Sequence, residues 1–231
     1  MRIKSFQLIL IRHLSSKSWM QRHVRDTFVK QSRYQNYRSR AAFKLIEIND
    51  RYRLLKPGMI VIECGAAPGS WTQVIVECLH LKPPDCHKTG AVIALDKADF
   101  APIPGAICLP KTDFTSHISQ AKILSALNDR KADLILSDMS PNVSGQHDYD
   151  HERILQLVYL TIRFSSICLK DQGNFLAKIF NGNQTEKLVK DLSRIFENVR
   201  QVKPEASRLD STELFILATG FKGRNNNEEI L

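Results

Sequence analysis

The chain has 231 residues, 43% of them hydrophobic, and its 33 Lys and Arg against 24 Asp and Glu give a formal net charge of +9. This length suits one domain with a full core, and no apolar run reaches the roughly 20 residues of a membrane-spanning helix. The basic balance favours an anionic partner, with nucleic acid first, although a merely basic protein remains the alternative. The five cysteines include no Cys-x-x-Cys pair, so we expect neither a disulfide framework nor a bound metal.

The N-terminal residues 1–25 carry six basic residues, four Ser and no Asp or Glu. This composition is typical of a mitochondrial transit segment, which we expect over residues 1–18, with the mitochondrial matrix as destination. A secretory signal fits less well, because its apolar core would end at Arg12. A basic RNA-binding arm is the alternative, and the two interpretations can hold together in part.

Residues 26–44 remain basic and include Tyr34, Tyr37 and Phe43, and helical spacing predicts a helix from Ala41 to Ile48. Basic residues beside aromatic ones suit a nucleic-acid backbone with stacked bases, so we interpret residues 19–55 as an RNA-binding part. The expected positive surface consists of Arg22, Arg25, Lys30, Arg33, Arg38 and Arg40. A solvated helix face is the alternative.

A short apolar run, Met59 to Ile62, precedes small residues from Gly65 to Ser70 and an apolar segment from Thr72 to Leu79. This pattern predicts a buried strand, a tight turn and a helix whose first amides face a ligand. Such a unit opens the nucleotide-binding half of a doubly wound α/β sheet. The Gly-x-Gly-x-x-Gly fingerprint and the Gly-Lys-Ser/Thr of a P-loop are absent from the sequence. A turn without any ligand is the alternative.

Strand and helix patterns alternate through the rest of the chain. The predicted strands are 91–95, 106–109, 132–137, 174–179, 199–202 and 214–219, and the predicted helices are 116–127, with Ser116 as N-cap, 151–169 and 184–196. This alternation predicts a mostly parallel sheet with helices on both faces. We expect one domain over residues 19–220 and a polar tail over residues 221–231.

Three acids, Asp96, Asp113 and Asp138, follow predicted strands. In open α/β sheets, ligands bind beyond the carboxyl ends of the strands. Asp96 suits the ribose hydroxyls of an adenosine, and Asp113 suits the adenine amino group. Each acid alone reads as an ordinary turn or cap residue. Together with the small-residue turn, they predict an adenosine site.

Six motifs stand in one order along the chain. They are Arg-Ser-Arg-Ala-Ala-Phe-Lys-Leu at 38–45, Gly-Ala-Ala-Pro-Gly-Ser-Trp at 65–71, Ser-Asp-Met-Ser-Pro-Asn-Val-Ser-Gly at 137–145, Phe-Leu-Ala-Lys-Ile-Phe at 175–180, Lys-Pro-Glu-Ala-Ser-Arg at 203–208 and Ser-Thr-Glu at 211–213. In these motifs the chain resembles the FtsJ/RrmJ family of RNA ribose 2′-O-methyltransferases, which use S-adenosylmethionine. The resemblance runs from about Trp19 to Gly220 and implies a Rossmann-like α/β fold, with a seven-stranded sheet whose last strand is antiparallel.

The resemblance also implies functional residues. The catalytic set falls on Lys44, Asp138, Lys178 and Glu213, and the cofactor contacts fall on Gly65, Pro68, Gly69, Ser70, Trp71, Asp96, Asp113, Phe114 and Asp138. Three departures from the family pattern are visible. Glu63 stands where Asp is usual, Ser70 stands where many members have Gly, and residues 81–89 look like an insertion that is more typical of mitochondrial members than of bacterial ones. None of them removes a catalytic group.

The implied reaction is attack of a ribose 2′-oxygen on a sulfonium methyl group, with Lys178 as the base or, alternatively, as an orienting cation. The favoured substrate is a uridine of mitochondrial large-subunit rRNA, in support of ribosome assembly. One alternative is a cytosolic tRNA or nuclear pre-rRNA methyltransferase of the same family. Another is a ribosome-assembly factor that binds RNA without activity, against which the complete catalytic set argues.

Overall fold

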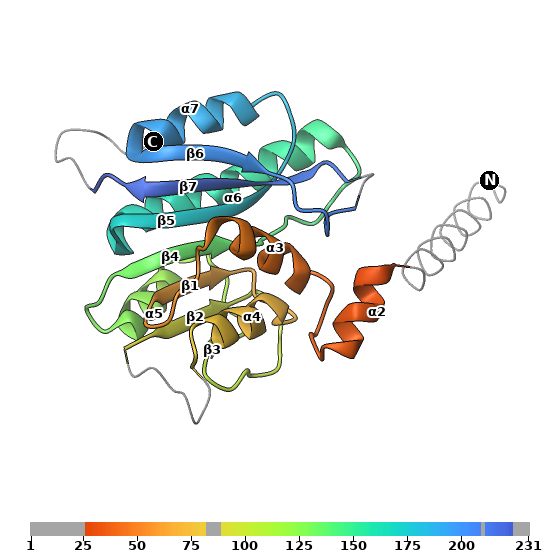
Figure 1. Cartoon of the computed structure of the whole chain (residues 1–231). Helices are drawn as coiled ribbons and strands as arrows, with labels where there is room; N and C mark the ends of the chain where they lie inside the picture. Colours follow the sequence, from red (N-terminus) through yellow and green to blue (C-terminus); the bar gives the residue numbers. More distant parts are fainter. Residues whose placement is uncertain (1–25, 82–88, 209–210, 224–231) are drawn as a thin grey trace, which may run out of the picture.

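A computed structural model of the chain describes residues 26–81, 89–208 and 211–223 (Figure 1). Its strands are β1 Ile60–Cys64, β2 Ala91–Leu95, β3 Ile107–Leu109, β4 Ala132–Ser137, β5 Leu169–Phe180, β6 Phe196–Val202 and β7 Glu213–Phe221. Its helices are α2 Thr27–Tyr34, α3 Ala42–Tyr52, α4 Ser70–Cys78, α5 His117–Leu127, α6 His147–Cys168 and α7 Thr185–Ile195. The expected transit segment, Arg22, Arg25, residues 82–88 of the expected insertion and residues 224–231 of the tail lie outside the described residues.

The strands form one seven-stranded sheet in the order β3-β2-β1-β4-β5-β7-β6. Strands β1 to β5 pair in parallel, whereas β7 lies antiparallel to both β5 and β6. This arrangement confirms the predicted mostly parallel sheet with an antiparallel last strand. Because β7 runs against β5, its first residue lies at the same sheet edge as the carboxyl ends of the parallel strands.

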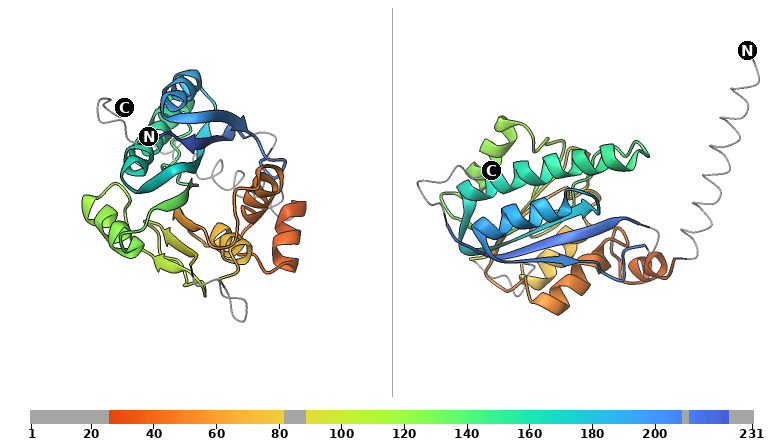
Figure 2. Two further views of the ribbon diagram at one scale, coloured as in Figure 1. Left: turned by 60° about the vertical axis from the view of Figure 1, so that its left-hand side comes forward. Right: turned by 90° about the horizontal axis from the view of Figure 1, so that it is seen from above.

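Helices cover both faces of the sheet, as predicted. Helices α3 and α4 lie on one face, and α5, α6 and α7 lie on the other (Figure 2). Successive side chains of β1 point to opposite faces of the sheet, so this strand contributes to the core on both sides. Ile62 joins the core cluster on the side of α5 to α7, and Val61 joins the cluster on the side of α3 and α4. The central strand is therefore buried along its whole length, with Asp96 and Asp138 just beyond its two neighbours.

Helix α2 is an element that the sequence pattern does not predict. Val29 and Ser32 are its buried residues and Phe28 is half-buried against Phe43, so its apolar face is too short to be recognised from residue spacing. Its start signal is Asp26, whose Oδ1 accepts a hydrogen bond from the Phe28 amide at 3.0 Å.

Several boundaries also differ from the prediction: α3 ends at Tyr52 instead of Ile48, and β6 begins at Phe196 instead of 199. Helix α6 begins at His147 instead of His151, because its first turn is polar and carries Asp148 and Asp150, the acids that suit a helix N-terminus. Strand β5 begins at Leu169 instead of 174, where exposed residues and a register shift against β4 mask the apolar pattern. Ser116 is the residue before α5, as predicted, but within the described residues its side chain makes no capping hydrogen bond.

The described cysteines, Cys64, Cys78, Cys108 and Cys168, are free. Within residues 26–81, 89–208 and 211–223, no three or more His, Cys, Asp and Glu side chains gather in a group that could hold a metal ion. None of the helices in this part of the chain has the length and apolar character that crossing a membrane requires.

Glu63 places a carboxyl group in the middle of this core. It is fully buried in β1, and its Oε2 accepts a hydrogen bond from the Thr72 hydroxyl at 2.6 Å. Its Oε1 has no hydrogen-bond partner among the described residues. Burial, with a smaller contribution from the nearby Asp138 and Asp96 charges, raises the pKa of Glu63 from 4.5 to about 8, against the lowering effect of Thr72. The side chain is therefore mostly neutral at pH 7.

Glu63 should make folding stability depend on pH. Between its unfolded and folded pKa, the folded state holds a proton that the unfolded state has lost, so stability falls as pH rises from 4.5 to about 8. We expect a loss on the order of a few kcal/mol over this range, measured against Glu63→Gln, which cannot ionise. Urea unfolding of both proteins at several pH values checks this. Parallel stability curves over this pH range would show that folding does not raise the pKa of Glu63.

Candidate functional site

The four residues of the predicted catalytic set come from four elements. Asp138 directly follows β4, Lys178 lies in β5, Glu213 begins β7, and Lys44 lies in the first turn of α3. Glu213 is paired across the sheet with Phe180, two residues beyond Lys178. The antiparallel direction of β7 therefore places Glu213 at the sheet edge where Asp138 and Lys178 also end.

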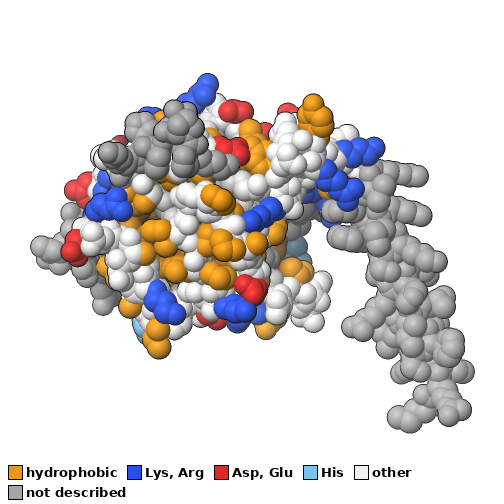
Figure 3. All heavy atoms as spheres, turned by 90° about the horizontal axis from the view of Figure 1, so that it is seen from below, with side chains coloured by type: hydrophobic (Ala, Val, Ile, Leu, Met, Phe, Trp, Pro, Cys, Tyr) orange, Lys and Arg blue, Asp and Glu red, His pale blue; other side chains and the backbone are white. Residues whose placement is uncertain are grey.

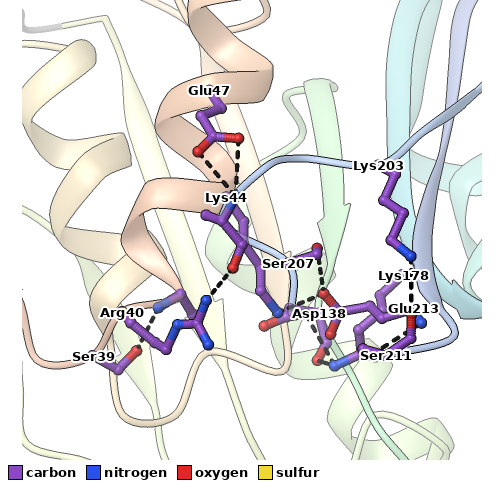
Figure 4. A network of polar contacts seen from close by, with 12 residues as sticks. Ser39, Arg40, Lys44, Glu47, Asp138, Lys178, Lys203, Ser207, Ser211 and Glu213 are labelled. Carbon is purple, nitrogen blue, oxygen red and sulfur yellow. Dashed lines mark hydrogen bonds and ion pairs between the residues drawn. The ribbon is translucent and has the colours of Figure 1, made fainter. Parts of the chain in front are cut away.

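The structure brings these side chains together as two ion pairs (Figure 4). Lys44 Nζ lies 2.6 Å from Glu213 Oε1, and Lys178 Nζ lies 3.0 Å from Asp138 Oδ1. Lys178 Nζ also donates a hydrogen bond to the backbone carbonyl of Asp138 at 2.7 Å. The side chains are between 10% and 19% exposed, so the group is mostly withdrawn from water. We call these four residues the four-charge cluster; its formal charges cancel.

The cluster keeps Glu213 ionised. Burial alone would raise the pKa of this carboxyl, but the charge and hydrogen bond of Lys44, the Lys178 charge and the Ser207 hydroxyl outweigh it and lower the pKa below its ordinary value. Asp138 is satisfied less completely. Its contact with Lys178 lacks hydrogen-bond geometry, which leaves Oδ1 a buried acceptor without a hydrogen-bond partner among the described residues. Such an oxygen is suited to receive a donor from a ligand.

A cavity of about 670 Å³ adjoins the cluster beyond the carboxyl ends of β1, β2 and β4. Its volume lies in the range of small-molecule and cofactor sites. The predicted site residues that line it are Gly65, Asp96, Asp113, Phe114, Asp138 and Lys178. The cavity therefore joins most of the predicted adenosine site to half of the four-charge cluster.

The turn after β1 is shaped by its small residues and by Asp96. Gly65 has φ +85°, and a Cβ there would lie 2.6 Å from the Met139 backbone nitrogen, so only glycine fits. Asp96 accepts hydrogen bonds from the amides of Ala67 at 2.8 Å and Ala98 at 2.7 Å. Its carboxylate thus holds the turn, and its oxygens retain acceptor capacity toward the cavity.

Asp113 and Phe114 form the far part of the cavity wall. Asp113 Oδ1 accepts hydrogen bonds from the Thr115 hydroxyl at 2.7 Å and amide at 3.0 Å, and these bonds lower the pKa of Asp113. Lys97 Nζ lies 3.2 Å from its Oδ2. The Phe114 ring packs edge-on against Phe164, with centroids 5.4 Å apart. An ionised acceptor thus stands beside a buried aromatic wall.

Four predicted cofactor contacts are not among the residues that line the described cavity: Pro68, Gly69, Ser70 and Trp71. Trp71 Nε1 donates to the Ala41 carbonyl at 2.7 Å, and its ring packs against Phe215 at 5.6 Å. Ser70 Oγ lies 2.7 Å from Ser39 Oγ. In the structure these side chains connect the turn to α3 and the core.

Arg38 and Arg40, expected on an RNA-facing surface, bind parts of the fold. Arg38 donates from Nη1 to the Pro68 carbonyl and from Nη2 to the Pro102 carbonyl, both at 2.9 Å. Arg40 Nη1 forms an ion pair with Asp26 at 2.7 Å. Arg38 thus supports the cavity turn from outside, and Arg40 joins α2 to the main body.

The α6 side of the cavity was not predicted from the sequence. This side is lined by Arg153, Gln156, Leu157 and Leu160, which follow the spacing i, i+3, i+4 and i+7 of one helix face. That spacing is visible in the sequence, but it is the same for a face that packs in a core. This helix face lines a cavity because α6 lies opposite the turn that follows β1, and that position is not visible in the sequence.

Comparisons with known proteins agree with this geometry. Residues 37–221 match the model of the FtsJ-like methyltransferases. The chain is 42% identical to rRNA methyltransferase 2, mitochondrial, of Drosophila melanogaster, over 94% of this chain and 87% of that protein. It is 41% identical to ribosomal RNA large subunit methyltransferase E of Xanthobacter autotrophicus, over 94% of this chain and 84% of that protein.

A solved structure described as a ribosomal RNA methyltransferase from Plasmodium falciparum superposes with a TM-score of 0.71 at 31% identity, covering 81% of this chain and 100% of that one. The segment that matches the family model contains the whole cavity wall and all four residues of the four-charge cluster. The chain therefore belongs to the FtsJ-like methyltransferase family.

Proposed function

We propose that this protein transfers a methyl group from S-adenosylmethionine to a ribose 2′-hydroxyl of RNA. The observation that carries the proposal is the four-charge cluster beside the cavity, with Lys178 and Asp138 lining the cavity itself. Charged groups from distant segments are costly to bury together and are expected where they act on a substrate. Family membership and the names of the relatives, which refer to rRNA methylation, support the same reaction.

The residues present fit S-adenosylmethionine. Asp96 would accept hydrogen bonds from the ribose hydroxyls and Asp113 would accept one from the adenine amino group, and Asp138 lines the same cavity with an Oδ1 that makes no hydrogen bond among the described residues. When bound, the cofactor supplies a methyl group on a positively charged sulfur. Acidic side chains along the cavity are complementary to that charge.

The protein must remove a proton from the 2′-hydroxyl as its oxygen forms a bond to the methyl carbon and the bond from that carbon to sulfur breaks. In its neutral form Lys178 can take this proton. As an ammonium it can only donate hydrogen bonds and orient the oxygen. Lys44 and Glu213 complete the charge balance around it and hold the reacting groups in line. We assign the base role to Lys178.

Replacement of Lys178 tests this assignment. Lys178→Ala should keep S-adenosylmethionine and RNA binding but lose turnover by roughly 10²-fold or more, the scale of lost general-base catalysis. Lys178→Arg should fail as well, because a guanidinium cannot give up its proton. The measurement is single-turnover methylation of an rRNA fragment as a function of pH, with cofactor binding followed by calorimetry.

Two variants serve as controls for this experiment. Lys190→Arg, at an exposed position of α7, should react like the wild type. Asp96→Ala should weaken cofactor binding by about 1–3 kcal/mol, because it leaves polar partners unpaired. A Lys178→Arg protein with a near-wild-type rate would exclude the base role and leave an orienting cation. A near-wild-type Lys178→Ala protein would remove Lys178 from the mechanism.

Within RNA, we propose a uridine of mitochondrial large-subunit rRNA as the substrate and the mitochondrial matrix as the location. The supporting observations are the relative named as mitochondrial and the acid-free composition of residues 1–25. Relatives from bacteria reach similar identity. A cytosolic tRNA or nuclear pre-rRNA substrate is the alternative within the family. A ribosome-assembly role without activity is disfavoured by the complete four-charge cluster.

An import experiment tests the proposed mitochondrial location. Residues 1–18, fused to a fluorescent reporter, should carry it into mitochondria, because basic, acid-free segments are the targeting signal. The matched control is the same segment with its basic residues changed to Gln at Arg2, Lys4, Arg12 and Lys17. A wild-type segment that leaves the reporter in the cytosol, or sends it to the nucleolus, would favour the alternative substrates.

We propose that α2 binds the RNA backbone. Lys30 and Arg33 are exposed on this helix, next to Tyr34, which is 88% exposed. In Figure 3, Lys and Arg side chains gather at the right of the molecule, where α2 joins the body.

The double substitution Lys30→Ala and Arg33→Ala should weaken RNA binding and reduce the slope of log affinity against log salt concentration by about 0.7–0.9 for each lost phosphate contact. Fluorescence anisotropy over a salt series measures both.

Cofactor binding should stay unchanged in that variant, since neither residue lines the described cavity. The matched control removes two exposed lysines elsewhere, Lys122 in α5 and Lys190 in α7. An equal effect of both double substitutions would mean that RNA responds to overall charge, and an unchanged affinity of the α2 variant would exclude this surface.

A further inference from the structure

One face of α3 presents three charged side chains to the segment between β6 and β7. Arg40, Lys44 and Glu47 are spaced four and three residues apart, which places them on the same side of a helix. Arg40 precedes the first residue of α3, but its carbonyl already accepts the Phe43 amide at 3.2 Å, so the helical turn includes it. Figure 4 shows the three side chains directed toward this segment.

The outer two side chains bind one residue, Ala206. Glu47 accepts the Ala206 amide, with the nitrogen 3.1 Å from Oε1 and 3.3 Å from Oε2. Arg40 Nη2 donates to the carbonyl of the same residue. Ala206 is fully buried and lies outside the strands, so these side chains supply the hydrogen bonds that a buried backbone requires. We call this arrangement the Ala206 clasp.

The next residue along the chain reaches the four-charge cluster. Ser207 Oγ donates to Glu213 Oε1 at 3.0 Å, the same oxygen that lies 2.6 Å from Lys44 Nζ. Because Ser207 directly follows Ala206, the clasp holds the backbone next to this hydroxyl, and the Ser207 amide donates to the Pro204 carbonyl at 3.0 Å. The middle side chain of the α3 face, Lys44, then meets Glu213 from the other side.

We propose that Arg40 and Glu47 are positioning residues for methyl transfer, which hold the Ala206 backbone so that Ser207 and Lys44 fix the Glu213 carboxylate. The inference rests on the proposed function and deepens it. Neither residue lines the described cavity, so neither is assigned a contact with cofactor or substrate. Their effect is on alignment, where a displacement of about 1 Å can cost roughly 10²-fold in rate.

The guanidinium of Arg40 is suited to hold the Ala206 backbone because its two terminal nitrogens bind different partners. Nη1 pairs with Asp26 at 2.7 Å, Nη2 donates to Ala206, and the group lies over the Phe28 ring at 5.6 Å. A planar fork can serve both partners in one fixed orientation, whereas a lysine ammonium offers a single point charge. Helix α2 is thereby attached to the same clasp.

The test compares four variants in steady-state methylation of an rRNA fragment. Rates are divided by the fraction of each protein that binds S-adenosylmethionine in calorimetry, so an unfolded fraction does not count as lost activity. Glu47→Ala and Arg40→Lys should lower kcat about 10-fold or more while KM for RNA changes less than about 3-fold. Glu47→Gln should recover most of the rate, because its amide oxygen still accepts the Ala206 N–H. Asp50→Asn, an exposed position on α3, should match the wild type.

A wild-type kcat in Glu47→Ala would overturn the proposal, and so would a Glu47→Gln rate as low as that of Glu47→Ala. A change confined to KM for RNA would assign these residues to substrate binding and would also overturn it. The proposed function is judged separately in the same assay. It fails if the wild type does not methylate RNA, or if Lys178→Ala is as active as the wild type.

Discussion

Two lysines and two carboxylates share a nearly dry space at one edge of the sheet, and none of them could remain charged there alone. Removing an ion from water costs several kcal/mol unless an opposite charge and hydrogen bonds replace the lost solvent. Lys44 with Glu213, and Lys178 with Asp138, meet this requirement pairwise. The rest of the site depends on it, because the partners come from α3, β4, β5 and β7 and must arrive together. The reversed direction of β7 is what makes that possible in a sheet of otherwise parallel neighbours.

Residues that line the cavity also stabilise the fold. Asp96 fixes the turn through two backbone amides while it faces the cavity. Gly65 allows the Asp138–Met139 backbone to approach closely enough to close the wall. Asp138 Oδ1 is the exception, since its ion pair with Lys178 lacks hydrogen-bond geometry and no described hydrogen bond of the fold uses this oxygen. A buried acceptor without a hydrogen bond is suited to a donor from the proposed cofactor or substrate.

Periodicity and strand-end chemistry were sufficient to predict the sheet, its two helical layers and the acids at its edge, because these follow from local pattern and one topological rule. The direction in which individual side chains point was not predictable from the sequence. Trp71 and Ser70 belong to the same motif as Gly65, yet their side chains turn toward α3 and the core. A sequence motif shows that residues lie near a site, but the backbone conformation of the turn determines whether each side chain points into the cavity or toward the core. Helix α2 was not predicted because its apolar contacts with the body come mainly from Phe28 and Val29, too few for a helical spacing pattern, and the Asp26–Arg40 ion pair adds a polar contact.

The basic motif at 38–45 looks like a single nucleic-acid patch, yet its cations have separate partners in the structure. Arg38 supports the turn, Arg40 holds Ala206, and Lys44 neutralises Glu213. Because the four-charge cluster is neutral as a whole, it adds little to the long-range attraction of a polyanion, which depends on net charge. That attraction must come from cations facing solvent, such as Lys30 and Arg33 on α2. In the proposed function, capture of RNA and alignment of the reacting groups therefore rest on different residues, and separate substitutions on α2 and at the clasp distinguish the two roles even though Arg40 joins α2 to the clasp.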